Sequence, residues 1–65
     1  MSETAQQYNA RMAGSLWHVE QLPEPLRDAY RGGPTTFATA VAHLQRMAGL
    51  TMDGKLGPKT LARLG

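Results

Sequence analysis

A polar turn near the C-terminus holds the residues of this chain that are best suited to recognition chemistry. Asp53 and Gly54 are followed by Gly57, Pro58 and Thr60. An aspartate carboxylate can accept backbone hydrogen bonds from its own turn, and glycine supplies the backbone freedom that a tight turn needs. Proline presets the φ angle at a helix start, and a threonine hydroxyl there can bond back to the loop. We interpret the main role of this turn as structural.

Catalytic and metal-binding chemistry has little support in the sequence. The chain has no cysteine, and the serines Ser2 and Ser15 belong to no visible Ser-His-acid grouping. The two histidines, His18 and His43, have no partner at a spacing that is typical of metal ligands. We therefore expect a protein that is not an enzyme and that needs no cofactor or metal.

Size and charge limit the class of protein and of partner. A chain of 65 residues is one domain at most. Its formal net charge is +2, and its seven lysines and arginines are scattered along the sequence. This distribution indicates a solvated surface, with weak attraction to anionic polymers such as DNA or the bacterial wall. No apolar run approaches the length of a membrane span, so no membrane partner is expected. The N-terminal sequence does not resemble a secretory signal, which predicts a protein that is cytoplasmic as synthesised.

The N-terminal third of the chain predicts a long amphipathic helix from Ser2 to about Leu22. Ser2 is the expected N-cap, and Pro23 stops the helix. Gly14 inside it predicts a kink or a close contact. The apolar positions recur at spacings of three and four, as on one helical face; they are Ala5, Tyr8, Met12, Leu16 and Val19, with Trp17 beside them.

Three further helical elements are expected after that proline. Residues Pro25 to Arg31 predict a short helical turn, and a longer helix starts near Thr35 or Thr36. Gly49 has the position of a left-handed helix cap, and Pro58 opens a last helix. The positions expected to face inward are Leu26, Ala29, Tyr30, Phe37, Val41, Leu44, Ala48, Leu61 and Leu64.

The stretch from Ala40 to Leu64 resembles the C-terminal half of the small peptidoglycan-binding domains. The matching positions are Ala40, Val41, Leu44, Gln45, Gly49, Leu50, Asp53, Gly54, Gly57, Pro58, Thr60 and Leu64. The resemblance implies an all-α fold, a small three-helix bundle, here with an extended N-terminal helix. It divides one compact domain into an N-terminal amphipathic helix (1–24) and a peptidoglycan-binding-like helical core (25–65). It also implies a ligand site at Gln45, Asp53, Gly54, Lys55, Gly57 and Thr60.

The first functional interpretation is a non-catalytic peptidoglycan-binding module. Lys55 and Lys59 could meet the carboxylates of the stem peptides in the wall polymer. Gln45 could either bridge its helix to the following loop or contact ligand. Because the chain begins with Met1 and ends just after the last helix, an accessory virion or lysis component of a bacteriophage would fit, and it would reach the wall after lysis.

A second interpretation is a protein-interaction or assembly subunit, which would form an oligomer or join a larger particle. The docking face would then be Tyr8, Met12, Leu16 and Trp17 on the N-terminal helix. Trp17 and Tyr30 could also serve as a platform for sugar rings, although their apolar surroundings favour a core or interface role. A third interpretation, a helix-turn-helix DNA-binding protein, is disfavoured because the loop is long and the last helix is brief.

Overall fold

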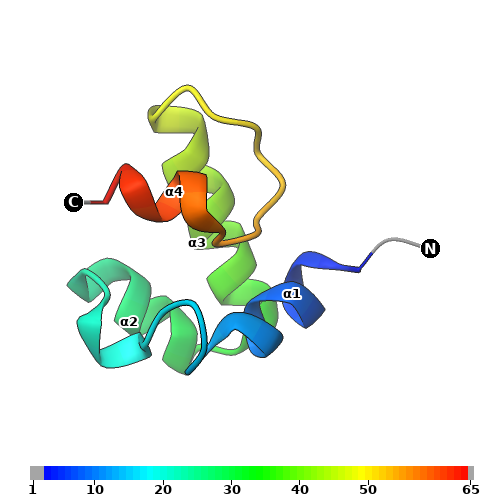
Figure 1. Cartoon of the computed structure of the whole chain (residues 1–65), viewed down its shortest axis with the longest axis vertical. Helices are drawn as coiled ribbons and strands as arrows, with labels where there is room; N and C mark the ends of the chain where they lie inside the picture. The colour runs from blue at the N-terminus through cyan, green and yellow to red at the C-terminus, as the bar shows by residue number, and fades with distance from the viewer. Residues whose placement is uncertain (1–2, 65) are drawn as a thin grey trace.

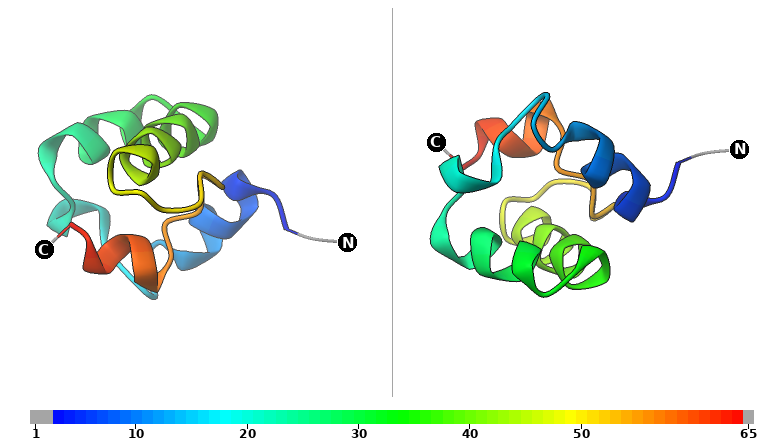
Figure 2. Two further views of the ribbon diagram at one scale, coloured as in Figure 1. Left: turned by 90° about the horizontal axis from the view of Figure 1, so that it is seen from above. Right: turned by 90° about the horizontal axis from the view of Figure 1, so that it is seen from below.

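Four α-helices and one 3₁₀ turn make up the fold of this computed structural model, which describes residues 3–64. They are α1 (Ala5–Met12), η1 (Val19–Gln21), α2 (Glu24–Arg31), α3 (Pro34–Met47) and α4 (Pro58–Ala62). Helices α1 and α2 both pack against α3, the longest helix (Figure 1). Seen from above and below, the loop 48–57 runs between α3 and the pair formed by α1 and α4 (Figure 2). The all-α class expected from the sequence is confirmed, with four helices where three main ones were expected.

The expectation of one continuous helix from Ser2 to Leu22 is wrong, because α1 ends at Met12. Ala13 already has extended backbone angles (φ −61°, ψ 125°), and Gly14 then turns the chain with a left-handed φ of 81°. The Gly14 N–H donates to the Trp17 carbonyl at 2.7 Å. The chain then continues through a bend into η1. The N-cap of α1 is Thr4, whose hydroxyl accepts from the Gln7 N–H at 3.1 Å in a capping box. Ser2, the expected cap, lies outside the described residues.

The later elements follow the sequence signals closely. The expected turn at 25–31 is the complete helix α2, and α3 begins at Pro34, so neither Thr35 nor Thr36 is its cap. Gly49 has a φ of 75°, and the N–H of Leu50 donates to the Gln45 carbonyl at 2.8 Å, as in a Schellman cap. Helix α4 begins at Pro58 as expected.

The hydrophobic core joins every segment of the chain to α3. Its buried apolar residues are Trp17, Leu22, Leu26, Phe37, Ala38, Val41 and Leu56. Three aromatic rings of the core pack against one another. The ring centroids are 6.2 Å apart for Trp17 and Tyr30, 5.5 Å for Trp17 and Phe37, and 5.1 Å for Tyr30 and Phe37. All positions that we expected to face inward are buried or partly buried. Within residues 3–64, no helix combines the length and apolar character needed to cross a membrane.

The effect of Gly14→Ala on the free energy of unfolding distinguishes a continuous N-terminal helix from a helix that ends at Met12. In a continuous helix, Gly14→Ala would stabilise the protein by about 1 kcal/mol through helix propensity. In this structure a Cβ at Gly14 meets nothing within 4 Å, but the positive φ remains strained for alanine. We expect Gly14→Ala to lower the free energy of unfolding by about 1–2 kcal/mol in urea denaturation. Ser15→Ala, at the adjacent exposed position, is the control and should be neutral; stabilisation by Gly14→Ala would contradict the break.

Candidate functional site

The loop 48–57 is irregular, and the side chain of Gln45 on α3 binds it from inside. Gln45 is only 2% exposed. Its Oε1 accepts from the Gly54 N–H at 2.9 Å. Its Nε2 lies 2.9 Å from Asp53 Oδ1, 3.1 Å from the Lys55 carbonyl oxygen and 3.0 Å from Thr60 Oγ1. One amide therefore ties α3 to the loop and to α4, which confirms the bridging interpretation of this residue.

Asn9 on α1 holds the same loop from the opposite side, and sequence reasoning missed it. Its Nδ2 donates to the Gly54 carbonyl at 2.9 Å, and its Oδ1 accepts from the Leu56 N–H at 2.8 Å. The side chain is 3% exposed, so both bonds are shielded from water. A signal was present in the sequence, because Asn9 is four residues after Ala5 and three before Met12, on the apolar face of its helix.

Trp17 makes the third side-chain contact to the loop. It is 3% exposed, and its Nε1 donates to the Leu56 carbonyl at 2.8 Å. The expectation that Trp17 belongs to an exposed docking face is therefore wrong, because its ring lies in the core of its own chain. Of the other residues expected on that face, Met12 packs against the core, Leu16 is 41% exposed and Tyr8 is half-buried.

A groove of about 680 Å³ lies between the loop and the start of α4. Its lining comprises Tyr8, Gln45, Gly49, Leu50, Thr51, Asp53, Lys55, Gly57, Pro58, Lys59 and Thr60. The structure thus brings together every expected ligand residue except Gly54. Gly54 is buried instead, and a Cβ there would lie 3.0 Å from the Ala38 carbonyl oxygen of α3. Gln45 and Thr60 are also buried, so they form the inner wall, and the more exposed lining groups are those of the loop and α4.

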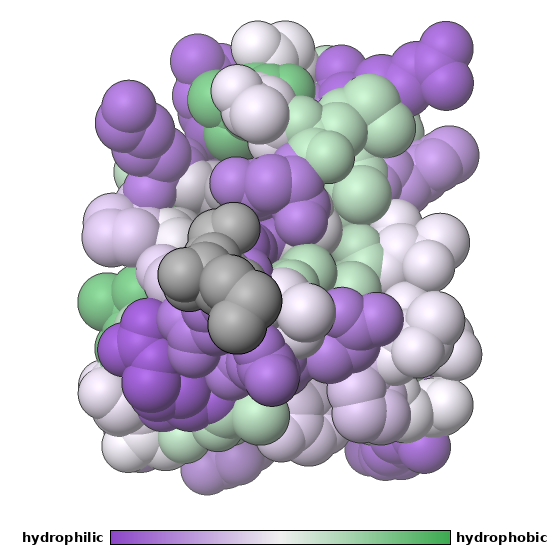
Figure 3. Space-filling model, turned by 90° about the vertical axis from the view of Figure 1, so that its right-hand side faces the viewer, coloured by the Kyte–Doolittle hydropathy of each residue, from purple (hydrophilic) through white to green (hydrophobic). Residues whose placement is uncertain are grey.

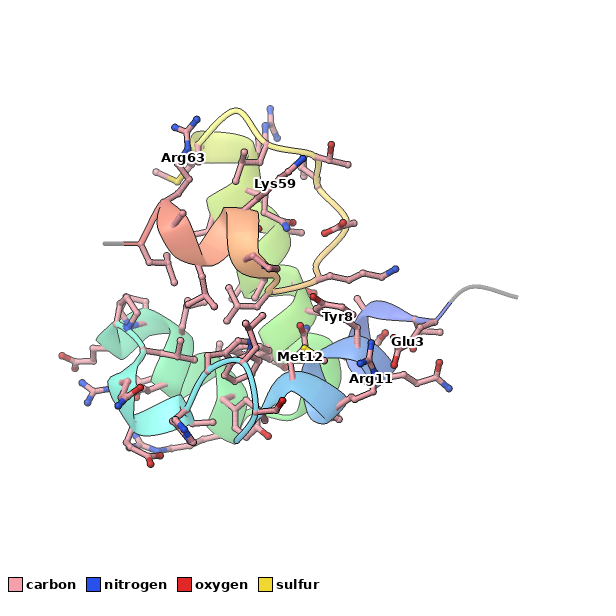
Figure 4. All side chains as sticks on the ribbon, in the orientation of Figure 1. Glu3, Tyr8, Arg11, Met12, Lys59 and Arg63 are labelled. Atoms are coloured by element: carbon pink, nitrogen blue, oxygen red, sulfur yellow. The ribbon has the colours of Figure 1, made fainter. Side chains whose placement is uncertain are left out.

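The charged side chains around the groove are mostly cationic. Its lining carries Lys55 and Lys59 and one carboxylate, Asp53, whose Oδ1 accepts from the Lys55 N–H at 2.9 Å. Figure 4 shows Lys59 on α4, Arg11 on α1, and Glu3 in the segment just before α1. The side of the molecule seen in Figure 3, which is the right-hand side of Figure 1, is mainly hydrophilic or neutral, with scattered apolar residues.

Arg11 and Glu3 form a two-bond ion pair beside the groove. Arg11 Nε and Nη2 donate to the two carboxylate oxygens of Glu3 at 2.9 and 2.8 Å. The hydrogen bonds from Arg11 lower the pKa of Glu3 below its usual value, and the charges of Arg11 and Lys55 lower it further. The same pair raises the pKa of Arg11.

Removal of Asn9 should show that the loop depends on α1. In Asn9→Ala, the Gly54 carbonyl and the Leu56 N–H remain buried without a partner. We expect the free energy of unfolding to fall by about 2–6 kcal/mol, since each of the two unpaired buried groups costs about 1–3 kcal/mol. Urea denaturation measures this loss, and amide hydrogen exchange at Leu56 should accelerate. Gln6→Ala on the same helix is the control; equal losses in both variants would contradict a specific role for Asn9.

The Glu3–Arg11 pair predicts a pH dependence with a defined sign. Because the pKa of Glu3 is lowered in the folded state, its stabilising contribution is present above its ordinary pKa and is lost as the pH falls through the lowered value. In Arg11→Ala, an NMR titration of the Glu3 carboxyl carbon should show the pKa rising toward 4.5. Arg31→Ala, which breaks the other described ion pair, should leave the pKa of Glu3 unchanged. An unchanged pKa in Arg11→Ala would contradict the pairing.

Comparison with known proteins gives one family match. Residues 31–64, just over half of the chain, match the model of the peptidoglycan binding domain. The matched span contains α3, the loop and α4, whereas Tyr8, Asn9 and Trp17 precede it. Searches of curated proteins and of solved structures found no match. The family match covers Gln45, the loop that it holds and most of the groove lining, and on this basis the chain belongs to the peptidoglycan binding domain family.

Proposed function

We propose that this protein is a non-catalytic module that binds peptidoglycan in the groove between the loop 48–57 and α4. The observation that carries the proposal is the coincidence of the family match with this groove. Of the six ligand positions expected from the sequence, five line the groove, and they come from α3, the loop and α4. The sixth, Gly54, lets the loop approach α3 closely enough to form the groove wall.

The lining groups divide into those that shape the groove and those that can reach a ligand. The amide of Gln45 is occupied by the loop and Thr60, so it serves as a support. The side chains of Asp53 and Lys59 are exposed, and Lys55 is partly exposed. Peptidoglycan offers complementary groups, because its stem peptides carry carboxylates and backbone amides. Ammonium groups would bind those carboxylates by charge-assisted hydrogen bonds.

The experiment is co-sedimentation of the purified protein with purified sacculi at low and moderate salt. We expect the wild type to be retained, and Lys55→Gln/Lys59→Gln to bind about five- to tenfold more weakly, as for two partly solvated charge contacts. Moderate salt should weaken wild-type binding as well, because it screens exposed charges.

The matched control is Arg27→Gln/Arg31→Gln, which removes the same charge from α2, outside the groove lining. This control should bind as the wild type does. If both double variants lost the same affinity for sacculi, the net charge of the protein and not the groove would explain the loss. Absence of wild-type retention, with a helical circular dichroism spectrum, would contradict the proposed function.

A further inference from the structure

Tyr8 forms one end of the groove, although it lies on α1, outside the segment that matches the family. A Cβ added at Gly57 would lie 2.8 Å from the Tyr8 hydroxyl oxygen, so a larger residue at this position would require the phenol to shift. Figure 4 shows the Tyr8 side chain directed from α1 toward the loop. Tyr8 therefore belongs to the groove lining, and its docking role stays a prediction from the sequence.

The surroundings of Tyr8 are cationic on both sides of the groove end. Lys55 Nζ lies 5.9 Å and Arg11 Cζ 5.4 Å from the centroid of the Tyr8 ring, both within the range of cation–π attraction. Arg11 is already paired with Glu3, whereas Lys55 forms no side-chain ion pair within residues 3–64. Lys55 is thus the cation at this end that is available to an anionic ligand.

The hydroxyl of Tyr8 is also available for a ligand. Within the described part of the chain, no hydrogen bond joins it to another protein group. The residue is only partly buried, and no buried side-chain polar atom lacks a partner in this region, so the hydroxyl is solvated. The Tyr8 O–H and the Lys55 ammonium, which lies 5.9 Å from the centroid of the Tyr8 ring, can offer two donors to one acceptor group.

We propose that Tyr8 and Lys55 form a carboxylate-binding corner that recognises the free C-terminal carboxylate of a peptidoglycan stem peptide. The inference rests on the proposed function and names the group of the polymer that the protein recognises. The Tyr8 O–H and the Lys55 ammonium donate to the two carboxylate oxygens, which is the strong, charge-assisted form of hydrogen bond. A free C-terminal carboxylate offers two charged oxygens to these two donors, whereas an amidated or cross-linked carboxyl group offers one uncharged carbonyl oxygen. Stems with a free carboxylate are therefore preferred over stems whose carboxyl group is amidated or cross-linked.

The test is a calorimetric titration of the full chain with two soluble disaccharide-peptides, one with a free C-terminal carboxylate and one with a C-terminal carboxamide. We expect the wild type to prefer the free acid by about tenfold, the effect of a hydrogen bond to a charged group. Tyr8→Phe should lose about tenfold in affinity for the free acid and bind the carboxamide unchanged. Tyr30→Phe is the matched control, because it removes the chain's other tyrosine hydroxyl from outside the groove lining.

The outcomes separate this inference from the proposed function. Sacculus binding with equal affinity for the two peptides, or with Tyr8→Phe equal to the wild type, would overturn the corner and leave the function standing. Binding of the free acid at Tyr8 without sacculus binding would overturn the function and leave the corner. Failure of the sacculi and of both peptides to bind would overturn both, and failure of the two peptides alone would overturn the corner. Lys55→Met serves as a second variant should Tyr8→Phe unfold, and it should show the same loss for the free acid alone.

Discussion

The fold depends on how the backbone of residues 53–56 finds its hydrogen bonds. This segment has no helix or sheet to pair with, yet Gly54 and Leu56 are buried. Unpaired peptide groups at such depth would each cost about 1–3 kcal/mol. Side chains from three distant places supply the partners: Gln45 from α3, Asn9 from α1 and Trp17 from the bend before η1. These side chains provide the hydrogen bonds that a neighbouring strand would provide in a sheet.

This arrangement explains why the N-terminal segment cannot be an independent helix attached to a core. Trp17 must turn inward so that its indole N–H reaches Leu56, and the turn at Gly14 makes this possible. The same turn of the chain places the Trp17 ring against the rings of Tyr30 and Phe37. Residues outside the family match therefore complete the support of a loop that lies inside it. The family pattern defines the loop, and the preceding segment fixes it in place.

The groove follows from the same constraint. Gln45 binds the loop from its inner side, through the Asp53 carboxylate and the Lys55 carbonyl, and a hollow remains between the loop and α4. Tyr8 lines this hollow, and Gly57 beside it has no side chain that would displace the phenol. Recognition in such a groove needs little movement of the protein, since the groups that shape it are already hydrogen-bonded.

The sequence by itself determined the features that local chemistry controls. The glycine cap at Gly49, the helix start at Pro58 and the inward stripe of α3 could be predicted, because each depends on residues near in the chain. For Gln45 the sequence offered a bridge or a ligand contact, and the structure shows the bridge. Five of the six expected ligand positions do meet in one groove. Tertiary structure alone decided the break after Met12, the burial of Trp17, the bonds of Asn9 and the place of Tyr8. An apolar spacing of three and four fits either one long helix or a helix followed by a turn. The second arrangement forms because Asn9 and Trp17 make hydrogen bonds to loop residues that are 39–47 positions away in the sequence.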